Sequence, residues 1–234
     1  HCVAFEYVLE TFPLDRDKVY NVHLDTDSMA KKEAFINKYL IRMTEENLDI
    51  ESAEGKKDFV RNLVATNIVM EGIWFYSGFM VMLSFRQRNQ LRNFGSMINW
   101  VLRDESLHLK FGINLIHNIL EENTELLTEE FAAEIRNIII EGVDLETAYN
   151  KDLFPNGILG LNADYVNQYV QYVADRRLAE LGMPKYYNAT NPAKWMSTAT
   201  DVFELVNFFE AQNTSYEVDG HAGTTAKKEP AATV

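Results

Sequence analysis

The sequence predicts an all-α protein. Apolar residues recur at intervals of three and four along much of its 234 residues, which is the spacing of helices that bury one face. Several of these segments begin after a residue that favours a helix N-cap and end before glycine or proline. No stretch shows a sustained period-two pattern with hairpin turns. The predicted helices are long enough to form a bundle.

The N-terminal part predicts two helices joined by an irregular connector. Residues 1–12 carry apolar side chains about every 3.6 positions, and a proline ends the run. After the connector, which we interpret as a loop or a partly helical segment, Asp27 or Ser28 can cap a second helix that extends to about Met43. The acidic residues 44–52 then predict a solvated loop.

The longest predicted helix covers about residues 53–87 and carries Glu71 in its most apolar part. Gly72 and Gly78 also lie inside it. Glycines close to a buried carboxylate in a long helix indicate a distortion such as a π-bulge. The nearest candidate for a membrane span is residues 68–85. Because Glu71 interrupts that run, we expect no transmembrane segment.

The C-terminal half predicts three further helices, at residues 95–122, 129–153 and 163–181. Thr128 and Asn162 can cap the second and third of these, and Gly182 can end the last. Beyond it the helical period fades, and a final segment rich in Ala, Thr, Gly, Lys, Glu and Pro predicts a mobile tail. We therefore divide the chain into a helical domain, residues 1–206, and a flexible C-terminal tail, residues 207–234.

Composition limits the functional classes. The net charge of −13 argues against binding to nucleic acid and against a polybasic membrane patch. A single cysteine, Cys2, excludes an internal disulfide framework and is typical of a reducing cytosol, and no signal-peptide pattern opens the chain. We therefore expect a cytoplasmic protein. The chain begins at His1 without an initiator Met, which is consistent with a fragment or with a processed form.

A carboxylate and an imidazole, Glu105 and His108, lie three residues apart in an apolar helical segment and therefore project from one helix face. This Glu-x-x-His spacing is used by di-metal sites in helical bundles. Glu71 offers a second carboxylate in an equally apolar helix, and His1 is a third candidate, one turn before Phe5. Carboxylates and imidazoles without thiolates favour iron or manganese over structural zinc.

Each candidate also has a structural alternative. Glu105 and His108 can form a pair on a helix surface, and Glu71 can form an ion pair, most plausibly with Arg103. A terminal histidine, taken alone, is more often incidental than a ligand. Asp104 points to a different face from Glu105, where it can orient a ligand imidazole or form an ion pair with Arg103 or Arg136.

Two segments, residues 70–79 and 103–109, resemble the second half of the small subunit of class I ribonucleotide reductases, the beta or radical-generating subunit. The resemblance extends along the chain to Tyr216. It includes the Asn-Pro and Trp-Met pairs of residues 191–196 and the Asn-Phe-Phe-Glu run at residues 207–210. The resemblance implies a ferritin-like helical bundle with a dinuclear metal site.

The resemblance also implies specific metal ligands. Four lie in this chain, and they are His1, Glu71, Glu105 and His108. Among them, Glu105 corresponds to the carboxylate that bridges the two metals. Two further ligands of the family, an Asp and a Glu, would lie upstream of this sequence, which predicts a missing N-terminal part.

Other family positions have counterparts here. Phe75, Phe79 and Val101 correspond to the apolar pocket beside the metals. Asp104 corresponds to the carboxylate that links a ligand histidine to the radical-transfer route, and Tyr216 to the tail tyrosine that relays the radical. The tail beyond this tyrosine corresponds to the peptide that docks on the large (alpha) subunit, and the family suggests a homodimer.

The chain departs from the common family pattern at Phe5. Most members have a radical-storing tyrosine at this position, whereas phenylalanine has no hydroxyl from which a phenoxyl radical could form. This departure is similar to the class Ic subgroup, in which a mixed manganese/iron centre holds the oxidising equivalent. The alternative is an inactivating substitution in an ordinary di-iron member. We favour a Mn/Fe centre and keep Fe/Fe as the alternative.

The resemblance thus implies the beta subunit of a ribonucleoside-diphosphate reductase, an oxidoreductase in which this subunit supplies the large subunit with an oxidising equivalent for the reduction of ribonucleotides. Two rivals remain. One is a ferritin-like oxidase that binds a lipid-like ligand, against which the tail relay argues. The other is a metal-poor structural bundle, which would pair its buried glutamates with arginines.

Overall fold

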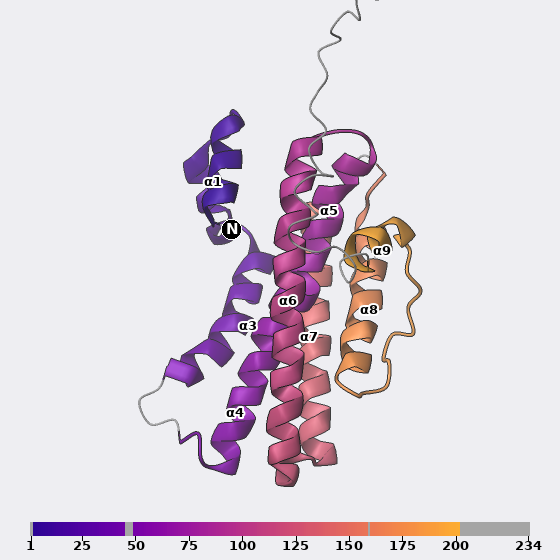
Figure 1. Ribbon diagram of the computed structural model, residues 1–234. Helices are drawn as coiled ribbons and strands as arrows, with labels where there is room; N and C mark the ends of the chain where they lie inside the picture. The colour runs from indigo at the N-terminus through magenta and orange to yellow at the C-terminus, as the bar shows by residue number, and fades with distance from the viewer. Residues whose placement is uncertain (1, 45–48, 159, 202–234) are drawn as a thin grey trace, which may run out of the picture.

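The computed structural model describes residues 2–44, 49–158 and 160–201, in which every regular element is a helix (Figure 1). The elements are α1 (Cys2–Thr11), α2 (Arg16–Tyr20), η1 (Val22–Leu24), α3 (Asp27–Thr44), α4 (Ala53–Leu63), η2 (Val64–Trp74), α5 (Phe75–Gln87), α6 (Arg92–Glu122), η3 (Thr124–Leu126), α7 (Glu129–Leu153), α8 (Ala163–Glu180) and α9 (Lys194–Asp201). The predicted all-α class is confirmed.

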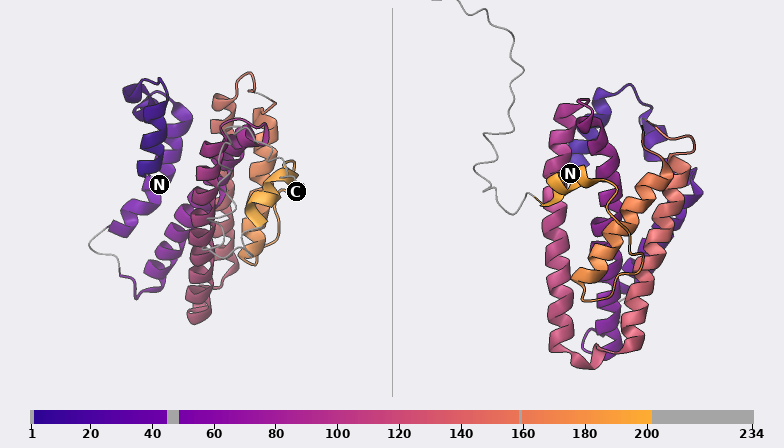
Figure 2. Two further views of the ribbon diagram at one scale, coloured as in Figure 1. Left: turned by 45° about the horizontal axis from the view of Figure 1, so that its top comes forward. Right: turned by 90° about the vertical axis from the view of Figure 1, so that its right-hand side faces the viewer.

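The bundle is built around one continuous helix, which comprises α4, η2 and α5. Helices α6, α7 and α8 pack along it, and α3 packs against α7 and α4 (Figure 1). Helix α1 lies at the end of α3, on the side of the bundle away from α8 (Figure 2). The central helix therefore contacts helices on several sides, which explains why its sequence is apolar almost all round.

The starts of α7 and α8 follow the predicted caps, whereas α3 already includes Asp27, which was predicted as a residue that caps it. The Thr128 side chain accepts a hydrogen bond from the amide of Phe131, and α7 has the predicted bounds. The Asn162 side chain likewise accepts from the amide of Tyr165 at the start of α8. Both predicted N-caps are therefore confirmed.

The distortion predicted in the longest helix is more extensive than a single bulge. All 11 residues of η2 form a π-helix, and its last bond runs from the Phe75 amide to the Met70 carbonyl. By length and composition the whole helix, Ala53–Gln87, could cross a membrane, but 61% of its most apolar window is buried by the rest of the protein. Such burial is typical of the central helix of a bundle.

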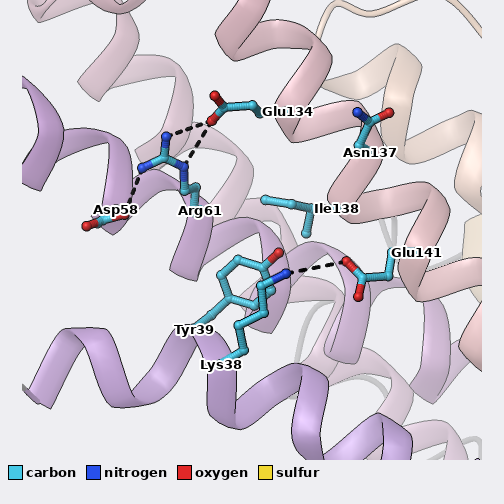
Figure 3. A pocket seen from close by; sticks show the side chains of 8 residues that line it. All are labelled: Lys38, Tyr39, Asp58, Arg61, Glu134, Asn137, Ile138 and Glu141. Atoms are coloured by element: carbon cyan, nitrogen blue, oxygen red, sulfur yellow. Dashed lines mark hydrogen bonds and ion pairs between the residues drawn. The ribbon is translucent and has the colours of Figure 1, made fainter.

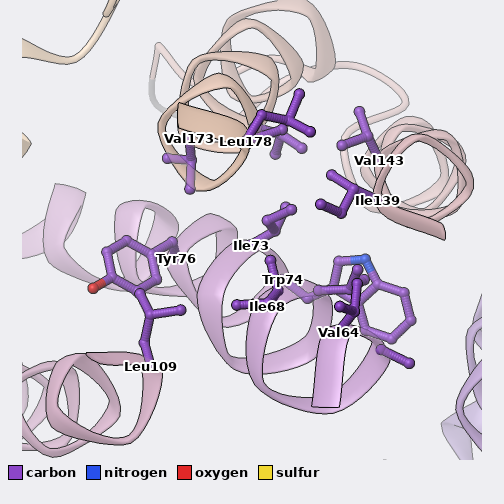
Figure 4. Close-up of a cluster of buried hydrophobic side chains, with 14 of the residues drawn as sticks. Val64, Ile68, Ile73, Trp74, Tyr76, Leu109, Ile139, Val143, Val173 and Leu178 are labelled. Atoms are coloured by element: carbon purple, nitrogen blue, oxygen red, sulfur yellow. The ribbon is translucent and has the colours of Figure 1, made fainter. Parts of the chain in front are cut away.

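The core gathers around η2, which packs very closely on α6 and α7 (Figure 4). A Cβ atom on Gly142 of α7 would lie 2.3 Å from Val69 Cγ1, and one on Gly112 of α6 would lie 2.7 Å from Asn67 Cβ. Glycine is therefore required at both positions for the helices to approach. The Trp74 indole N–H donates to the Gly142 carbonyl at 2.8 Å across the same contact.

The sequence did not predict α9, because we expected the helical period to end after residue 185. The preceding segment is ordered by Asp175, which is 1% exposed and accepts hydrogen bonds from the backbone amides of Tyr186, Tyr187 and Ala189. Helix α9 then buries Met196, which is 1% exposed. Tertiary contacts therefore form this helix. The proposed boundary between the domain and the tail lies outside the described residues.

Candidate metal centre

The structure brings three of the four proposed ligands together. Carboxylate and imidazole atoms of Glu71, Glu105 and His108 all lie within 4.8 Å of one another. Glu71 comes from η2, and the other two come from consecutive turns of α6. His1, the fourth proposed ligand, lies outside the described residues.

The three side chains differ in burial. Glu105 is 3% exposed and lies deepest. The His108 side chain is 55% exposed, and its Nδ1 lies 3.3 Å from Glu105 Oε2. Glu71 is half-buried, and its Oε2 accepts a hydrogen bond from Asn67 Nδ2 at 3.0 Å. One side of the cluster is therefore closed by protein, and the imidazole side is accessible.

The electrostatics favour a bound cation. Burial and, secondly, the negative charge of Glu105 raise the pKa of Glu71, while the Asn67 hydrogen bond and His108 oppose that rise. The structure shows no ion pair between Glu71 and Arg103, which was the structural alternative for this carboxylate. Two carboxylates that face one another in a partly buried site are stabilised by a divalent metal. The donor set suits iron or manganese.

The proposed apolar pocket is only partly closed. Phe79 and Val101 are 2% and 6% exposed, whereas Phe75 is 38% exposed. The rings of Phe75 and Phe79 meet edge to face, with centroids 6.3 Å apart. Phe5 is half-buried and packs against the apolar core. Asp104 is exposed and takes part in an interaction with its surroundings.

Comparison with known proteins decides the family. Residues 1–192 match the family described as "Ribonucleotide reductase, small chain". The chain belongs to this family. The resemblance seen in the sequence is thereby confirmed at the level of the family.

Individual members of the ribonucleotide reductase small-chain family extend this result. A ribonucleoside-diphosphate reductase subunit beta from Chlamydia pneumoniae is 40% identical over 94% of this chain and 64% of its own length. A subunit of the same name from Halalkalibacterium halodurans is 27% identical over 92% of this chain and 62% of its own length. The chain thus spans less than two thirds of the length of these relatives.

A solved structure supports the fold. The ribonucleotide reductase R2 subunit from Clostridium botulinum superposes with a TM-score of 0.75 and 26% identity, over 86% of this chain and 62% of that one. The chain therefore has the ferritin-like helical fold that the resemblance implied.

Sequence reasoning missed three residues that contact a proposed ligand or a residue next to one. Asn67 precedes Glu71 by four residues in the same helix, and a polar residue at that spacing was a usable signal. The Tyr76 hydroxyl lies 2.8 Å from Ser106 Oγ, and Arg177 Nε donates to the Gly72 carbonyl at 2.9 Å. The contact of Arg177 spans 105 positions, so no local pattern could reveal it.

A second polar region lies away from these ligands, in a cavity of about 330 Å³ between α3, α4 and α7 (Figure 3). Arg61 forms ion pairs there with Asp58 at 2.7 Å and with Glu134 at 2.6 Å, and Lys38 lies 3.7 Å from Glu141. Both cations are paired with carboxylates within the protein. They link α3 and α4 to α7 and have no role in the function we propose.

Proposed function

We propose that the chain is the metal-binding part of a class I ribonucleotide reductase small subunit. The observation that carries this proposal is the meeting of Glu71, Glu105 and His108 within 4.8 Å, in a member of the ribonucleotide reductase small-chain family. The rival of a metal-poor structural bundle predicted an arginine partner for Glu71, and its hydrogen-bond partner is Asn67 instead.

Each ligand has a distinct place in the proposed dinuclear centre. Glu105 lies deepest and faces both other side chains, which suits a carboxylate shared between two ions. Glu71 and His108 then serve as terminal ligands, and His1 completes the set contributed by this chain. When bound, such a centre uses oxygen to supply a one-electron oxidising equivalent to the large subunit.

The surrounding side chains keep the oxidising equivalent from reacting with water. Phe79 and Val101, which we place beside the ligands, are buried and present no group that can be protonated. Phe75, which is 38% exposed and meets the Phe79 ring edge to face, would extend this apolar wall toward solvent. An apolar lining also strengthens the electrostatic attraction between the carboxylates and the metals, because it lowers the local dielectric constant.

Phe5 leads us to propose a mixed manganese/iron centre. A phenylalanine ring has no hydroxyl proton to release, so it cannot store the radical as a phenoxyl. The proposed ligands His1, Glu71, Glu105 and His108 would then hold a metal pair that itself supplies the oxidising equivalent, and an Mn/Fe pair would provide that chemistry. An Fe/Fe centre remains the alternative composition for the same ligands.

The remaining assignments concern transfer to the large subunit. We propose that Asp104, next to the shared carboxylate, links the centre to the transfer route and that Tyr216 relays the oxidation. Residues 207–234 would form the docking tail and residues 1–206 the helical domain. The assembly would be a cytoplasmic homodimer that binds the large subunit and reduces ribonucleoside diphosphates with it.

Element-resolved diffraction tests this function. Anomalous scattering at the manganese and iron absorption edges, measured on crystals of the full-length small subunit, should place both elements beside Glu105. Iron alone at both positions would overturn the Mn/Fe composition. The absence of any bound metal after loading with both ions would overturn the metal centre itself.

A matched functional test concerns the relay. Tyr216→Phe should abolish ribonucleotide reduction with the large subunit and leave the metal content unchanged, because the substitution removes only a phenolic hydroxyl far along the chain from the ligands. Turnover equal to that of the wild type would remove Tyr216 from the route.

A further inference from the structure

A buried arginine lies behind the proposed metal centre. Arg177 of α8 is 3% exposed, and its Nε donates to the Gly72 carbonyl at 2.9 Å. Its guanidinium carbon lies 4.8 Å from the centroid of the Tyr76 ring, and its Nη1 lies 2.6 Å from Glu180 Oε2. The positive charge is thus compensated by a carboxylate, an aromatic face and a backbone carbonyl.

The carbonyl that Arg177 contacts lies at a special point of the central helix. The π-helix makes its last bond from the Phe75 amide to the Met70 carbonyl, and α-helical spacing resumes at Phe75. Five residues before Phe75 is Met70 and four residues before Tyr76 is Gly72, so the carbonyl that the change of spacing passes over is that of Glu71. The Gly72 carbonyl is the first acceptor of the resumed α-helical spacing, and Arg177 Nε donates to it from outside the helix.

Three residues that link Arg177 to the site are the immediate sequence neighbours of the proposed ligands. Gly72 follows Glu71 in the sequence, and Leu109 follows His108. A Cβ atom on Gly72 would lie 2.8 Å from Leu109 Cδ1 and 3.3 Å from Arg177 Nε. Glycine at this position therefore lets both α6 and the guanidinium approach the central helix.

Tyr76 links Arg177 to the residue that follows Glu105. It extends from the central helix toward α6, where Leu109 lies (Figure 4). Ser106, the residue after Glu105, donates its hydroxyl hydrogen to the Leu102 carbonyl at 2.7 Å. Because serine has only one hydroxyl hydrogen, the Tyr76 hydroxyl must be the donor in the 2.8 Å contact with Ser106 Oγ. The Tyr76 ring in turn lies against Arg177.

We infer that Arg177 is a positioning residue for the metal centre: by bonding the Gly72 carbonyl and supporting the Tyr76 ring, it fixes the π-helix register and the separation of Glu71 from Glu105. This inference rests on the proposed function for its consequence, metal binding. Stability alone is a weaker explanation, because buried ion pairs can often be replaced by apolar residues without loss of stability.

The test uses the full-length protein and the variant Arg177→Lys, which keeps the positive charge but lacks the planar fork that reaches Gly72 and Glu180 together. In the metal-free protein, hydrogen–deuterium exchange should become at least about tenfold faster at the amides of residues 72–79, while α7 keeps its protection. Mn²⁺ affinity, measured from the electron paramagnetic resonance signal of unbound Mn²⁺, should fall by about 10- to 100-fold.

Glu180→Gln is the matched control, since it removes the ion pair of Arg177 and leaves the Gly72 and Tyr76 contacts. Its Mn²⁺ affinity and its exchange at residues 72–79 should stay close to those of the wild type. Tyr76→Phe removes only the hydroxyl contact with Ser106, and it should weaken Mn²⁺ binding at unchanged helix content. This variant serves as the second test should Arg177→Lys fail to fold.

The outcomes separate the two proposals. Wild-type exchange at residues 72–79 in Arg177→Lys would overturn the positioning role, whatever the protein binds. A folded Arg177→Lys or Tyr76→Phe variant with wild-type Mn²⁺ affinity would also overturn it. A wild-type protein that binds neither Mn²⁺ nor Fe²⁺ would instead refute the proposed function, and the exchange measurement on the metal-free protein would still decide whether Arg177 holds the register.

Discussion

Replacing Glu71 by glutamine should stabilise the metal-free protein at neutral pH. The carboxylate oxygens of Glu71 and Glu105 come within 4.8 Å of each other. Two unit negative charges at about that separation repel by about 3.5 kcal/mol at an effective dielectric constant near 20 and by about 0.9 kcal/mol in bulk water. Because Glu71 is only half-buried, solvent screens the pair, and we expect Glu71→Gln to gain about 1 kcal/mol.

The gain should depend on pH in a defined direction. Burial and the charge of Glu105 raise the pKa of Glu71 above its ordinary value of 4.5. A carboxyl group whose pKa is higher in the folded state favours folding when it is protonated, and that contribution is lost as the pH rises through the folded pKa. The advantage of Glu71→Gln should therefore be present above that pKa and disappear below pH 4.5.

Thermal unfolding in the presence of a chelator, followed by circular dichroism, measures this effect. A gain of about 1 kcal/mol corresponds to a rise of about 2–4 °C in Tm for a chain of this size. Glu121→Gln is the control, because it removes one negative charge from an exposed position of α6. A Tm for Glu71→Gln at or below that of the wild type at neutral pH would refute the reasoning. So would a gain that persists unchanged in acid.

Three other substitutions test separate parts of the structure. Gly142→Ala should destabilise the protein by about 1–3 kcal/mol, because its Cβ would lie 2.3 Å from Val69 Cγ1, and an unchanged Tm would contradict this close packing. Thr128→Ala removes the cap on the Phe131 amide and should lower the free energy of unfolding, measured by denaturant titration, by about 1 kcal/mol. Thr128→Ser keeps a hydroxyl that can accept the same hydrogen bond and should keep most of that stability. His108→Ala should keep the wild-type Tm, since that side chain is 55% exposed, but should lose at least about tenfold in Mn²⁺ affinity; equal affinity would remove it from the ligands.

The parts of the fold that sequence predicted are those set by local chemistry. Thr128 and Asn162 mark helix starts because each side chain bonds an amide three residues ahead. The pairing of Glu105 with His108 follows from helix geometry in the same way. Their meeting with Glu71 could be anticipated, because a carboxylate in an apolar helix needs a compensating partner.

The parts that sequence did not predict depend on contacts between distant residues. Helix α9 depends on a segment that Asp175 orders through three backbone amides, and none of these contacts leaves a periodic pattern. The glycines near Glu71 indicated a distortion, but its length of 11 residues depends on packing against α6 and α7. Arg177 was overlooked because its partner, Gly72, is recognisable only in the folded protein.

The length of the π-helix also determines which side chains of α5 face the proposed site. Each residue added to a helical turn rotates the following side chains by about 100° around the axis. Phe79 lies beyond the junction, and in the function we propose it must line the same site as Glu71, which lies before it. Loss of the π spacing would therefore turn Phe79 away from the site even if Glu71 kept its place. A donor at Gly72 holds both halves of the helix in the register that one site requires, which is why we place the control of that register at Arg177.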